Sequence, residues 1–223
     1  MIILLPAIIL FLILCARSYA KSELTFFHPG HACFVVENGL EKLVIDPYDD
    51  SLGYPVVEGV ANYAISSHGH FDHCYTDKIK VEQGSGSFTI EKVESFHDNR
   101  QGADRGSNTI HVITTGGIRI AHLGDLGHLL TEKQLPALQN IDVLLIPIGG
   151  TYTLDPQQAA EVVKQIDPAV VVPMHYQTKE LKNLRLASVE EFLTLVKGEY
   201  EILRSGDKKW VYKKPAKKAV VVF

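Results

Sequence analysis

A six-residue cluster, His68-Gly69-His70-Phe71-Asp72-His73, constrains this chain more than any other feature. It follows residues 63–66, a short run that predicts a β-strand. Neutral imidazoles and carboxylates are the ligands that a borderline-soft divalent ion such as zinc prefers. Packing does not explain three His and one Asp in six residues, because these side chains are rarely buried without partners. A solvated loop is the alternative, but the cluster favours a metal site at the end of a strand.

Three further candidate ligands occur where predicted strands end. His97 ends the alternating run 88–96, Asp125 lies just beyond a strand at 118–123, and His175 ends an apolar run. Each alone has an ordinary explanation, since a polar residue often caps a strand and Gly-Asp is a common turn. Strand ends in a two-layer sandwich can meet at one rim. Together with the cluster, these residues would supply five histidines and two aspartates, enough for two ions with an open position.

Length and composition indicate one globular domain. The chain has 223 residues, of which 46% are hydrophobic and 22% charged, and no composition break suggests a second domain. The formal net charge is -4, so nothing globally basic indicates nucleic-acid binding. Cys33 lies in a strand-like run and is expected to be a small core residue. Cys74 follows the histidine cluster as a bystander, a metal neighbour or an oxidation-sensitive thiol.

Residues 1–20 are predicted to be a secretory signal peptide. An apolar run over 2–16 is followed by the small residues Ser18 and Ala20 at the spacing of a signal-peptidase site. The mature domain would then be 21–223, exported to the periplasm or secreted. Because the run is shorter than the ~20 residues of a spanning helix, no stable membrane span is expected after cleavage. An uncleaved membrane anchor is the alternative.

The first half of the chain is rich in strand patterns, and the second half alternates helix and strand. Strands are predicted at 24–28, 32–37, 42–46, 63–66, 88–96, 109–114, 118–123, 142–148, 169–174, 201–204 and 210–213. Capping boxes predict helix starts at Thr131 with Gln134, Asp155 with Gln158, and Ser188 with Glu191. The lysines of 213–218 are expected to form a solvated end. This order favours an α/β (α+β) fold with two sheets packed face to face and helices outside.

These residues resemble the metallo-β-lactamase superfamily, whose H-x-H-x-D-H hallmark is present without substitution. A narrower resemblance is to the branch of ascorbate-6-phosphate-lactonase-like hydrolases. It rests on Gly30-His31-Ala32-Cys33-Phe34, Ile45-Asp46-Pro47, the segment 67–73, Gly124-Asp125, Pro147-Ile148-Gly149-Gly150 and Pro173-Met174-His175-Tyr176. The resemblance implies a four-layer αββα sandwich and a metal-dependent hydrolase.

The resemblance also implies a role for each candidate ligand. One ion would be held by His68, His70 and His97, a second by Asp72, His73 and His175, and Asp125 would bridge both. The expected cofactors are two divalent ions, zinc with manganese as the alternative, and the expected partner is a small-molecule substrate. Two departures from the family pattern, His128 in Leu126-Gly127-His128 and the thiol of Cys74, remove no ligand.

A dinuclear site of this composition predicts hydrolysis of a small anionic lactone or phosphoester. Two dications lower the pKa of a shared water from ~15.7 towards ~7 in the best cases, and the hydroxide attacks the substrate. Two aspartates and a hydroxide leave such a core net positive, which favours anionic substrates. Asp72 is expected to orient the nucleophile as well as bind metal. His128, three residues after Asp125, is the candidate proton donor to the leaving group.

The remaining polar residues near these motifs have weaker assignments. The other histidines, His28, His31, His111 and His122, are expected to be structural. Arg100 or Arg105, in the polar loop 98–108, would clamp a carboxylate or phosphate. The alternative is a solvated loop with Arg105 paired to a neighbouring Asp. Tyr176 and Thr178 flank the site as substrate contacts or as supports of the ligands.

Two other functional classes stay open on this scaffold, an iron-based redox protein and a metal-binding protein without turnover. The chain carries no G-x-S-x-G, H-E-x-x-H, Walker A or C-x-x-C motif. A serine hydrolase, a zincin, a P-loop NTPase and a thioredoxin are therefore unsupported.

Overall fold

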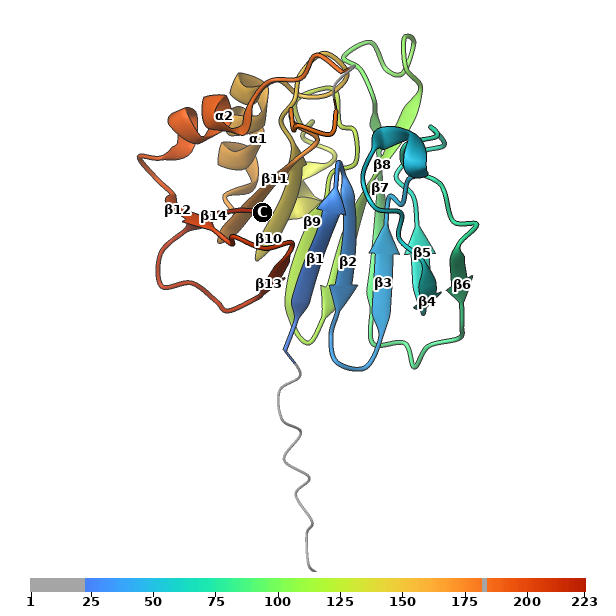
Figure 1. Cartoon of the computed structure of the whole chain (residues 1–223). Coiled ribbons are helices and arrows are strands. Elements are labelled where there is room, and N and C mark those ends of the chain that lie inside the picture. Colours follow the sequence, from blue (N-terminus) through green and yellow to red (C-terminus); the bar gives the residue numbers. More distant parts are fainter. Residues whose placement is uncertain (1–22, 182–183) are drawn as a thin grey trace, which may run out of the picture.

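A computed structural model describes residues 23–181 and 184–223 of the chain (Figure 1). The predicted signal peptide, 1–20, lies outside the described residues. The described chain folds into two β-sheets packed face to face, and this confirms the predicted sandwich of the metallo-β-lactamase type. Among the described residues, no helix combines the length and the apolar character needed to cross a bilayer.

The first sheet has five strands in the order β13-β1-β2-β3-β5. Their bounds are β1 Thr25–Gly30, β2 Cys33–Glu37, β3 Lys42–Ile45, β5 Tyr63–Ile65 and β13 Lys209–Val211. The predicted hairpin turn at Asn38-Gly39 joins β2 and β3, and the Asn38 side chain accepts the N–H groups of Leu40 and Glu41. A two-stranded sheet nearby pairs β4 Gly59–Ala61 with β6 Ile79–Val81.

The second sheet has seven strands in the order β12-β14-β11-β10-β9-β8-β7. Their bounds are β7 Thr89–Phe96, β8 Ser107–Thr115, β9 Ile118–His122, β10 Val143–Pro147, β11 Val170–Met174, β12 Glu201–Arg204 and β14 Ala219–Val222. β9, β10 and β11 are parallel, whereas β8 is antiparallel to both β7 and β9. The carboxyl ends of β7, β9 and β11 therefore share one edge of the sheet, and this edge carries the candidate ligands.

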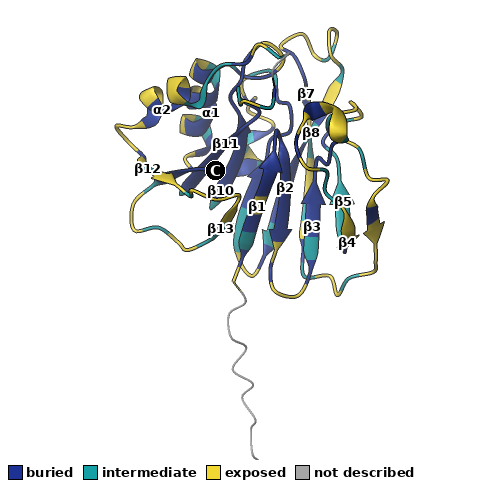
Figure 2. Cartoon of the chain, viewed as in Figure 1, coloured by how far each residue is buried: buried dark blue, intermediate teal, exposed yellow. Residues whose placement is uncertain are grey.

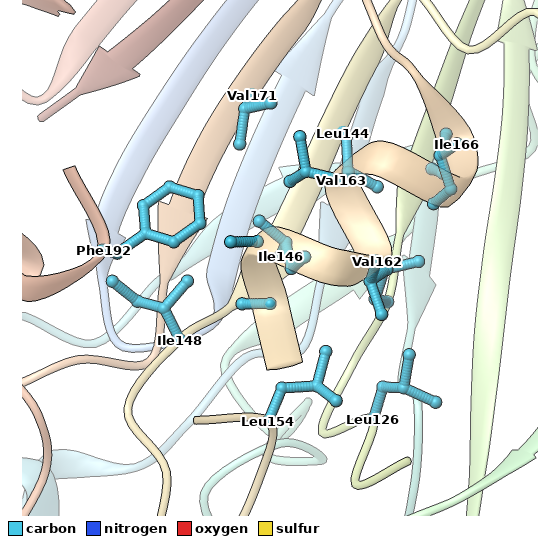
Figure 3. Close-up of a cluster of buried hydrophobic side chains, with 14 of the residues drawn as sticks. Leu126, Leu144, Ile146, Ile148, Leu154, Val162, Val163, Ile166, Val171 and Phe192 are labelled. Carbon is cyan, nitrogen blue, oxygen red and sulfur yellow. The ribbon is translucent and has the colours of Figure 1, made fainter. Parts of the chain in front are cut away.

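Apolar side chains fill the space between the sheets and the space under the helices. Phe34 and Ile45 of the first sheet pack with Leu145 and Val172 of the second. On the far side of the second sheet, α1 Pro156–Ile166 and α2 Val189–Val196 cover strands β10 and β11. Figure 3 shows Val163 of α1 and Phe192 of α2 over the buried side chains of this sheet. Every residue of β10 and β11 is buried, as the continuous apolar runs predict for strands covered on both faces.

The outer face of the first sheet is covered mainly by loops. A 3₁₀ turn, η1 Asp50–Leu52, packs with Tyr48, Tyr54 and Leu181 against Val35 and Val44 of that sheet. Figure 2 shows buried residues on the strands of both sheets and exposed residues on loops and on the outer sides of the helices. Within the described ranges, the two α-helices lie on the second sheet, so the helical layer is complete on that side only.

The three predicted helix starts give two α-helices and one short turn. Asp155 and Ser188 form reciprocal capping boxes with Gln158 and Glu191. Thr131 also bonds to the Gln134 side chain, but only a 3₁₀ helix follows, η2 Leu135–Leu138. Pro136 has no N–H to donate, and the left-handed Asn140 ends the segment, so no longer helix can form there.

Candidate metal centre

All seven predicted ligands come together at the shared strand edge. They follow β5 (His68, His70, Asp72 and His73), β7 (His97), β9 (Asp125) and β11 (His175). The loops hold them there through backbone hydrogen bonds between the sheets: the N–H of His175 donates to the carbonyl of His31 at 3.0 Å. The sequence rule that strand ends meet at one rim is confirmed here.

Asp125 lies at the centre of this group. Its Oδ2 is 3.0 Å from Nε2 of His97 and 4.0 Å from Nε2 of His68. The same oxygen is 3.3 Å from Nε2 of His73 and 3.4 Å from Nε2 of His175. One carboxylate therefore contacts histidines from both of the ligand sets that the resemblance implies.

The donor atoms of the group fit metal ions. Nitrogen and oxygen ligand atoms lie within 4.8 Å of one another in three overlapping groups, which are His68, His70 and His97; His68, His73 and Asp125; and His31, Asp72, His73 and His175. Nε2 of His68, Nε2 of His73 and Oδ1 of Asp125 are buried without a hydrogen-bond partner. Buried polar atoms are rarely left unpaired, and a bound cation would satisfy these three. Imidazole and carboxylate donors suit zinc and similar divalent ions.

In three of the histidines, a hydrogen bond made by Nδ1 fixes the direction in which Nε2 points. Nδ1 of His73 lies 2.9 Å from Oδ2 of Asp46, and Nδ1 of His97 lies 3.0 Å from the carbonyl of Tyr152. These oxygens can only accept, so each Nδ1 carries a proton, and in the neutral ring Nε2 presents a lone pair to the site. Nδ1 of His68 donates in the same way to the Ser67 hydroxyl at 2.9 Å, because that hydroxyl donates its own proton to Asp46.

Asp46, for which the sequence predicted no role, bonds to the candidate ligand His73 and to Ser67. Its fully buried carboxylate accepts the N–H of Ser67 at 2.6 Å, the Ser67 hydroxyl at 2.6 Å and the ring of His73. Burial opposes ionisation of this carboxyl, but His122 and the hydrogen bonds from His73 and Ser67 outweigh burial and lower its pKa to about 2. A fixed negative charge therefore stands directly behind the His73 ligand.

The pKa shifts differ from one candidate ligand to the next. Burial, reinforced by His73, lowers the pKa of His68 to about 4, so that its ring is neutral near pH 7. Burial disfavours the carboxylate of Asp125, yet the nearby rings of His175 and His73 hold its pKa well below the usual range. Burial disfavours the charged rings of His73 and His97, but Asp125 outweighs burial and raises the pKa of both, so these two rings would release a proton when a divalent ion binds.

His31, expected from the sequence to be structural, lies beside the candidate ligands. Its buried ring donates from Nε2 to Oδ2 of Asp72 at 3.2 Å and lies 4.1 Å, centre to centre, from the ring of His175. Its backbone is left-handed, with φ 55°, in the turn that follows β1. The criterion that selected His97, a histidine at a strand end, could have selected His31 too.

His128 does not join the site. Its Nε2 accepts the N–H of Phe96 at 3.2 Å, and its Nδ1 donates to the carbonyl of Leu129 at 2.7 Å. Both ring nitrogens are therefore used by the backbone, and the ring does not line the cavity over the ligands. The expectation that His128 protonates a leaving group is corrected by this placement.

The other histidines and the cysteines have structural surroundings. His28 donates from Nδ1 to the carbonyl of Cys33, and His122 bonds through Nε2 to the carbonyl of Ala32, each at 2.9 Å. His111 faces His122 across strands β8 and β9. Cys33 is buried, as expected of a core residue, whereas Cys74 is exposed, and both are free thiols. Cys74 belongs to none of the ligand groups of the described residues.

A cavity of about 730 Å³ opens over the ligands, a size typical of small-molecule sites. Asp72, Asp125 and the rings of three histidines form one part of its lining. Of the two candidate arginines, Arg105 lines the cavity, whereas Arg100 instead pairs with Asp104 at 2.8 Å. Tyr176 and Thr178 do not line it, and the Thr178 hydroxyl is hydrogen-bonded to Tyr54.

Comparison with known proteins gives consistent matches over most of the chain. A family model described as a beta-lactamase superfamily domain matches residues 23–175. A UPF0173 metal-dependent hydrolase of Desulforamulus reducens is 32% identical over 198 residues, which cover 70% of this chain and 85% of the relative. Another, from Pyrobaculum islandicum, is 31% identical over 186 residues, 67% of this chain and 82% of its own.

A solved structure shares the fold. It is a Thermotoga maritima protein described as a candidate Zn-dependent hydrolase of the metallo-β-lactamase superfamily, with a TM-score of 0.72, 35% identity, and coverage of 89% of this chain and 97% of that one. The narrower lactonase-like branch is not among these matches and stays a prediction. The matched family domain includes every predicted ligand from His68 to His175. These matches show that the chain belongs to the metallo-β-lactamase superfamily, among the metal-dependent hydrolases of that fold.

Proposed function

We propose that the protein is a hydrolase that holds two divalent ions and cleaves a small anionic lactone or phosphoester. In this proposal, His68, His70 and His97 hold one ion, Asp72, His73 and His175 hold the other, and Asp125 is shared. The observation that carries it is the position of Asp125, whose Oδ2 lies within 4.0 Å of Nε2 of His68, His73, His97 and His175. Zinc suits this nitrogen and oxygen donor set, and manganese is the alternative.

Bound divalent ions would supply an acidified water and would polarise the bond to be cleaved. The residues of the chain orient the attacking water and the metal ligands. Asp72 lines the cavity with a side chain that is 17% exposed, so its carboxylate can accept a hydrogen bond from the attacking water and orient it. His31 holds Asp72 in place through its Nε2. The buried carboxylate of Asp46 and the carbonyl of Tyr152 keep His73 and His97 in the tautomer that presents Nε2 to the ions.

The first test measures metal and turnover in the same preparation. The purified protein is expected to contain about two zinc or manganese ions per chain, as the proposed ligand sets require. It should hydrolyse simple lactones or bis(p-nitrophenyl) phosphate, and a chelator should abolish the activity reversibly. Iron in place of zinc or manganese would favour a redox protein, and bound metal without any turnover would favour a binding protein. Either result would overturn the proposal.

A pair of histidine variants locates the activity. His70→Ala removes a proposed ligand, and we expect loss of metal and of at least about 100-fold in kcat/KM, because an incomplete metal site loses its main catalytic contribution. His128→Ala is the matched control, since both ring nitrogens of His128 bond to the backbone outside the cavity. Metal content and kcat/KM should stay within about twofold in this control. Retained activity in His70→Ala would refute the assigned site.

We also propose that residues 1–20 direct export. The supporting observation is the apolar run followed by Ser18 and Ala20. In a bacterial host that expresses the whole chain, the exported protein should begin at Lys21, which intact-mass measurement of the isolated product would establish. A full-length product retained in the membrane would support the anchor instead.

A further inference from the structure

The cavity over the ligands has two chemically different parts. Away from the ligands, its wall is apolar and is formed by Leu52, Phe71, Leu181 and Leu184. Phe71 is 63% exposed, so its ring is accessible to a molecule in the cavity. Arg105 also lines the cavity, and it contributes the one Lys or Arg side chain among the described lining residues. An apolar wall and one cation imply a substrate that carries both kinds of group.

The guanidinium of Arg105 is held in position without being neutralised. Its Nη2 donates to the carbonyl of Thr151 at 2.9 Å, and its central carbon lies 5.6 Å from the centre of the Tyr152 ring. This hydrogen bond uses one of five N–H donors. Arg105 has no ion-pair partner within the described residues, whereas the side chain of Arg100 is paired with Asp104. Arg105 therefore keeps a free charge and free donors for a ligand.

The loop that carries Arg105 is anchored to the metal centre. The carboxylate of Asp98, which is only 4% exposed, accepts the backbone N–H groups of Arg100, Gly102, Asp104 and Arg105 at 2.8–3.0 Å. Asp98 is the neighbour of the ligand His97. The His97 ring and the Arg105 guanidinium also bond to consecutive carbonyls, those of Tyr152 and Thr151. The distance between the proposed ions and the guanidinium is thus set by the same short segments of backbone.

The charge distribution gives a bound molecule one orientation. Glu180 also lines the cavity, and its carboxylate would repel an anionic group placed beside it. An anionic group is attracted towards Arg105, and its apolar part can then lie along the leucine side chains. The planar guanidinium is suited to a carboxylate or a phosphate, which it can bind through two parallel hydrogen bonds.

We propose that the substrate is a small amphiphilic anion, whose remote carboxylate or phosphate binds Arg105 while an apolar body lies against Leu52, Phe71, Leu181 and Leu184. The bond cleaved lies at the other end, over the metal ligands. This inference rests on the proposed hydrolase function and makes Arg105 a residue that determines specificity. It requires a charge on the substrate away from the reacting group.

A series of activated esters tests this inference. Mono(4-nitrophenyl) adipate carries a remote carboxylate, its methyl-capped diester lacks the charge, and 4-nitrophenyl 6-(phosphonooxy)hexanoate replaces the carboxylate by a phosphate. The native protein should prefer a charged ester over the capped diester by about 10- to 100-fold in kcat/KM, as expected for a charge-assisted hydrogen bond. The arm with the larger preference identifies the natural anion as carboxylate or phosphate.

Variants assign the preference to one side chain. In Arg105→Gln the ratio of kcat/KM between charged and capped esters should fall to near one, and Arg105→Lys should retain part of it because the charge remains. Arg100→Gln is the matched control from the same loop and should keep the native ratio. An unchanged ratio in Arg105→Gln, or no preference in the native protein, would overturn the inference and leave the hydrolase function standing.

Ligand-binding measurements test the role of Arg105 independently of the hydrolase proposal. If the metal-loaded protein hydrolyses none of these esters or lactones, the hydrolase proposal fails. Binding of 6-phenylhexanoate and its amide by calorimetry then decides the remaining question. The native protein should bind the acid at least about tenfold more tightly than the amide, and Arg105→Gln should remove the difference. If the carboxylate of the acid contacts only bound metal, the difference in affinity between acid and amide will persist in Arg105→Gln. That result would refute the role of Arg105.

Discussion

At the scale of single residues, the site depends on which ring nitrogen of each histidine carries the proton. Nδ1 of His73 must donate to Asp46, because a carboxylate only accepts, and Nε2 is thereby turned towards Asp125. Asp46 is itself held by the N–H and the hydroxyl of Ser67. Asp46 and Ser67, neither of which lines the cavity, therefore determine the orientation of the His73 ring.

Asp46→Asn tests this dependence. The amide keeps the size of the side chain but removes its charge, so we expect metal affinity to fall by about 10- to 100-fold. Competition with a chromogenic chelator would measure the affinity, and circular dichroism would report whether the fold persists. Asp207→Asn, which changes an exposed carboxylate, is the control and should bind metal as the native protein does. Native affinity in Asp46→Asn would mean that the buried carboxylate does not support the site.

At the scale of elements, sequence patterns predicted the strands that have a strong pattern of their own. The alternating run 88–96 became β7, and the buried apolar runs became β10 and β11. β4 and β6 have only three residues each, too few for a periodic signal. β14 was missed because Ala219–Val222 follows a lysine-rich segment, and its place between β12 and β11 depends on contacts far along the chain.

The candidate site also contains residues that the sequence pattern predicts and contacts that it does not. The convergence of the seven candidate ligands could be predicted because each ends a recognisable strand or belongs to a dense local motif. The contacts that His31 and Asp46 make could not be predicted, since they depend on partners distant in sequence. His31 meets Asp72, which is 41 residues away, and Asp46 meets His73, which is 27 residues away. The expectation for His128 failed for the related reason that closeness to Asp125 in sequence does not turn a side chain towards the same cavity.

The missed strand gives a stability prediction. Val220 of β14 is 0% exposed and packs in the core under the helices, so Val220→Ala should lower the free energy of unfolding by about 2 kcal/mol. Leu203→Ala, in the neighbouring β12, changes a side chain that is 41% exposed and should cost clearly less. Urea denaturation of both variants measures the difference. Equal effects would show that β14 is not packed in the core.

At the scale of the whole molecule, the site lies where the two sheets meet. β5 of the first sheet delivers the segment 68–73, and β7, β9 and β11 of the second sheet deliver His97, Asp125 and His175. Metal bound by both groups would link the sheets, so it would stabilise the entire sandwich rather than one loop. Figure 1 shows the elements of both sheets converging on the same side of the molecule.

Acid should weaken the fold through a carboxylate outside the metal centre. The hydroxyl of Ser87 and the N–H groups of Ser87 and Gly86 bond to Glu41 and lower its pKa to about 2. The unfolded value is about 4.3, so Glu41 contributes stability above that pH and loses it as the pH falls towards about 2. In metal-free protein, the melting temperature of Glu41→Gln should fall less over this pH range than that of the native protein. The exposed Glu132→Gln should follow the native curve, and identical curves for Glu41→Gln would contradict the assignment.

Anomalous diffraction from crystals of the zinc-loaded protein tests the central claim most directly. We expect two metal peaks about 3.5–4 Å apart, with the carboxylate of Asp125 between them. One peak should be bound by His68, His70 and His97, and the other by Asp72, His73 and His175. Peaks found only elsewhere on the protein, or density for these side chains without any metal among them, would contradict the account.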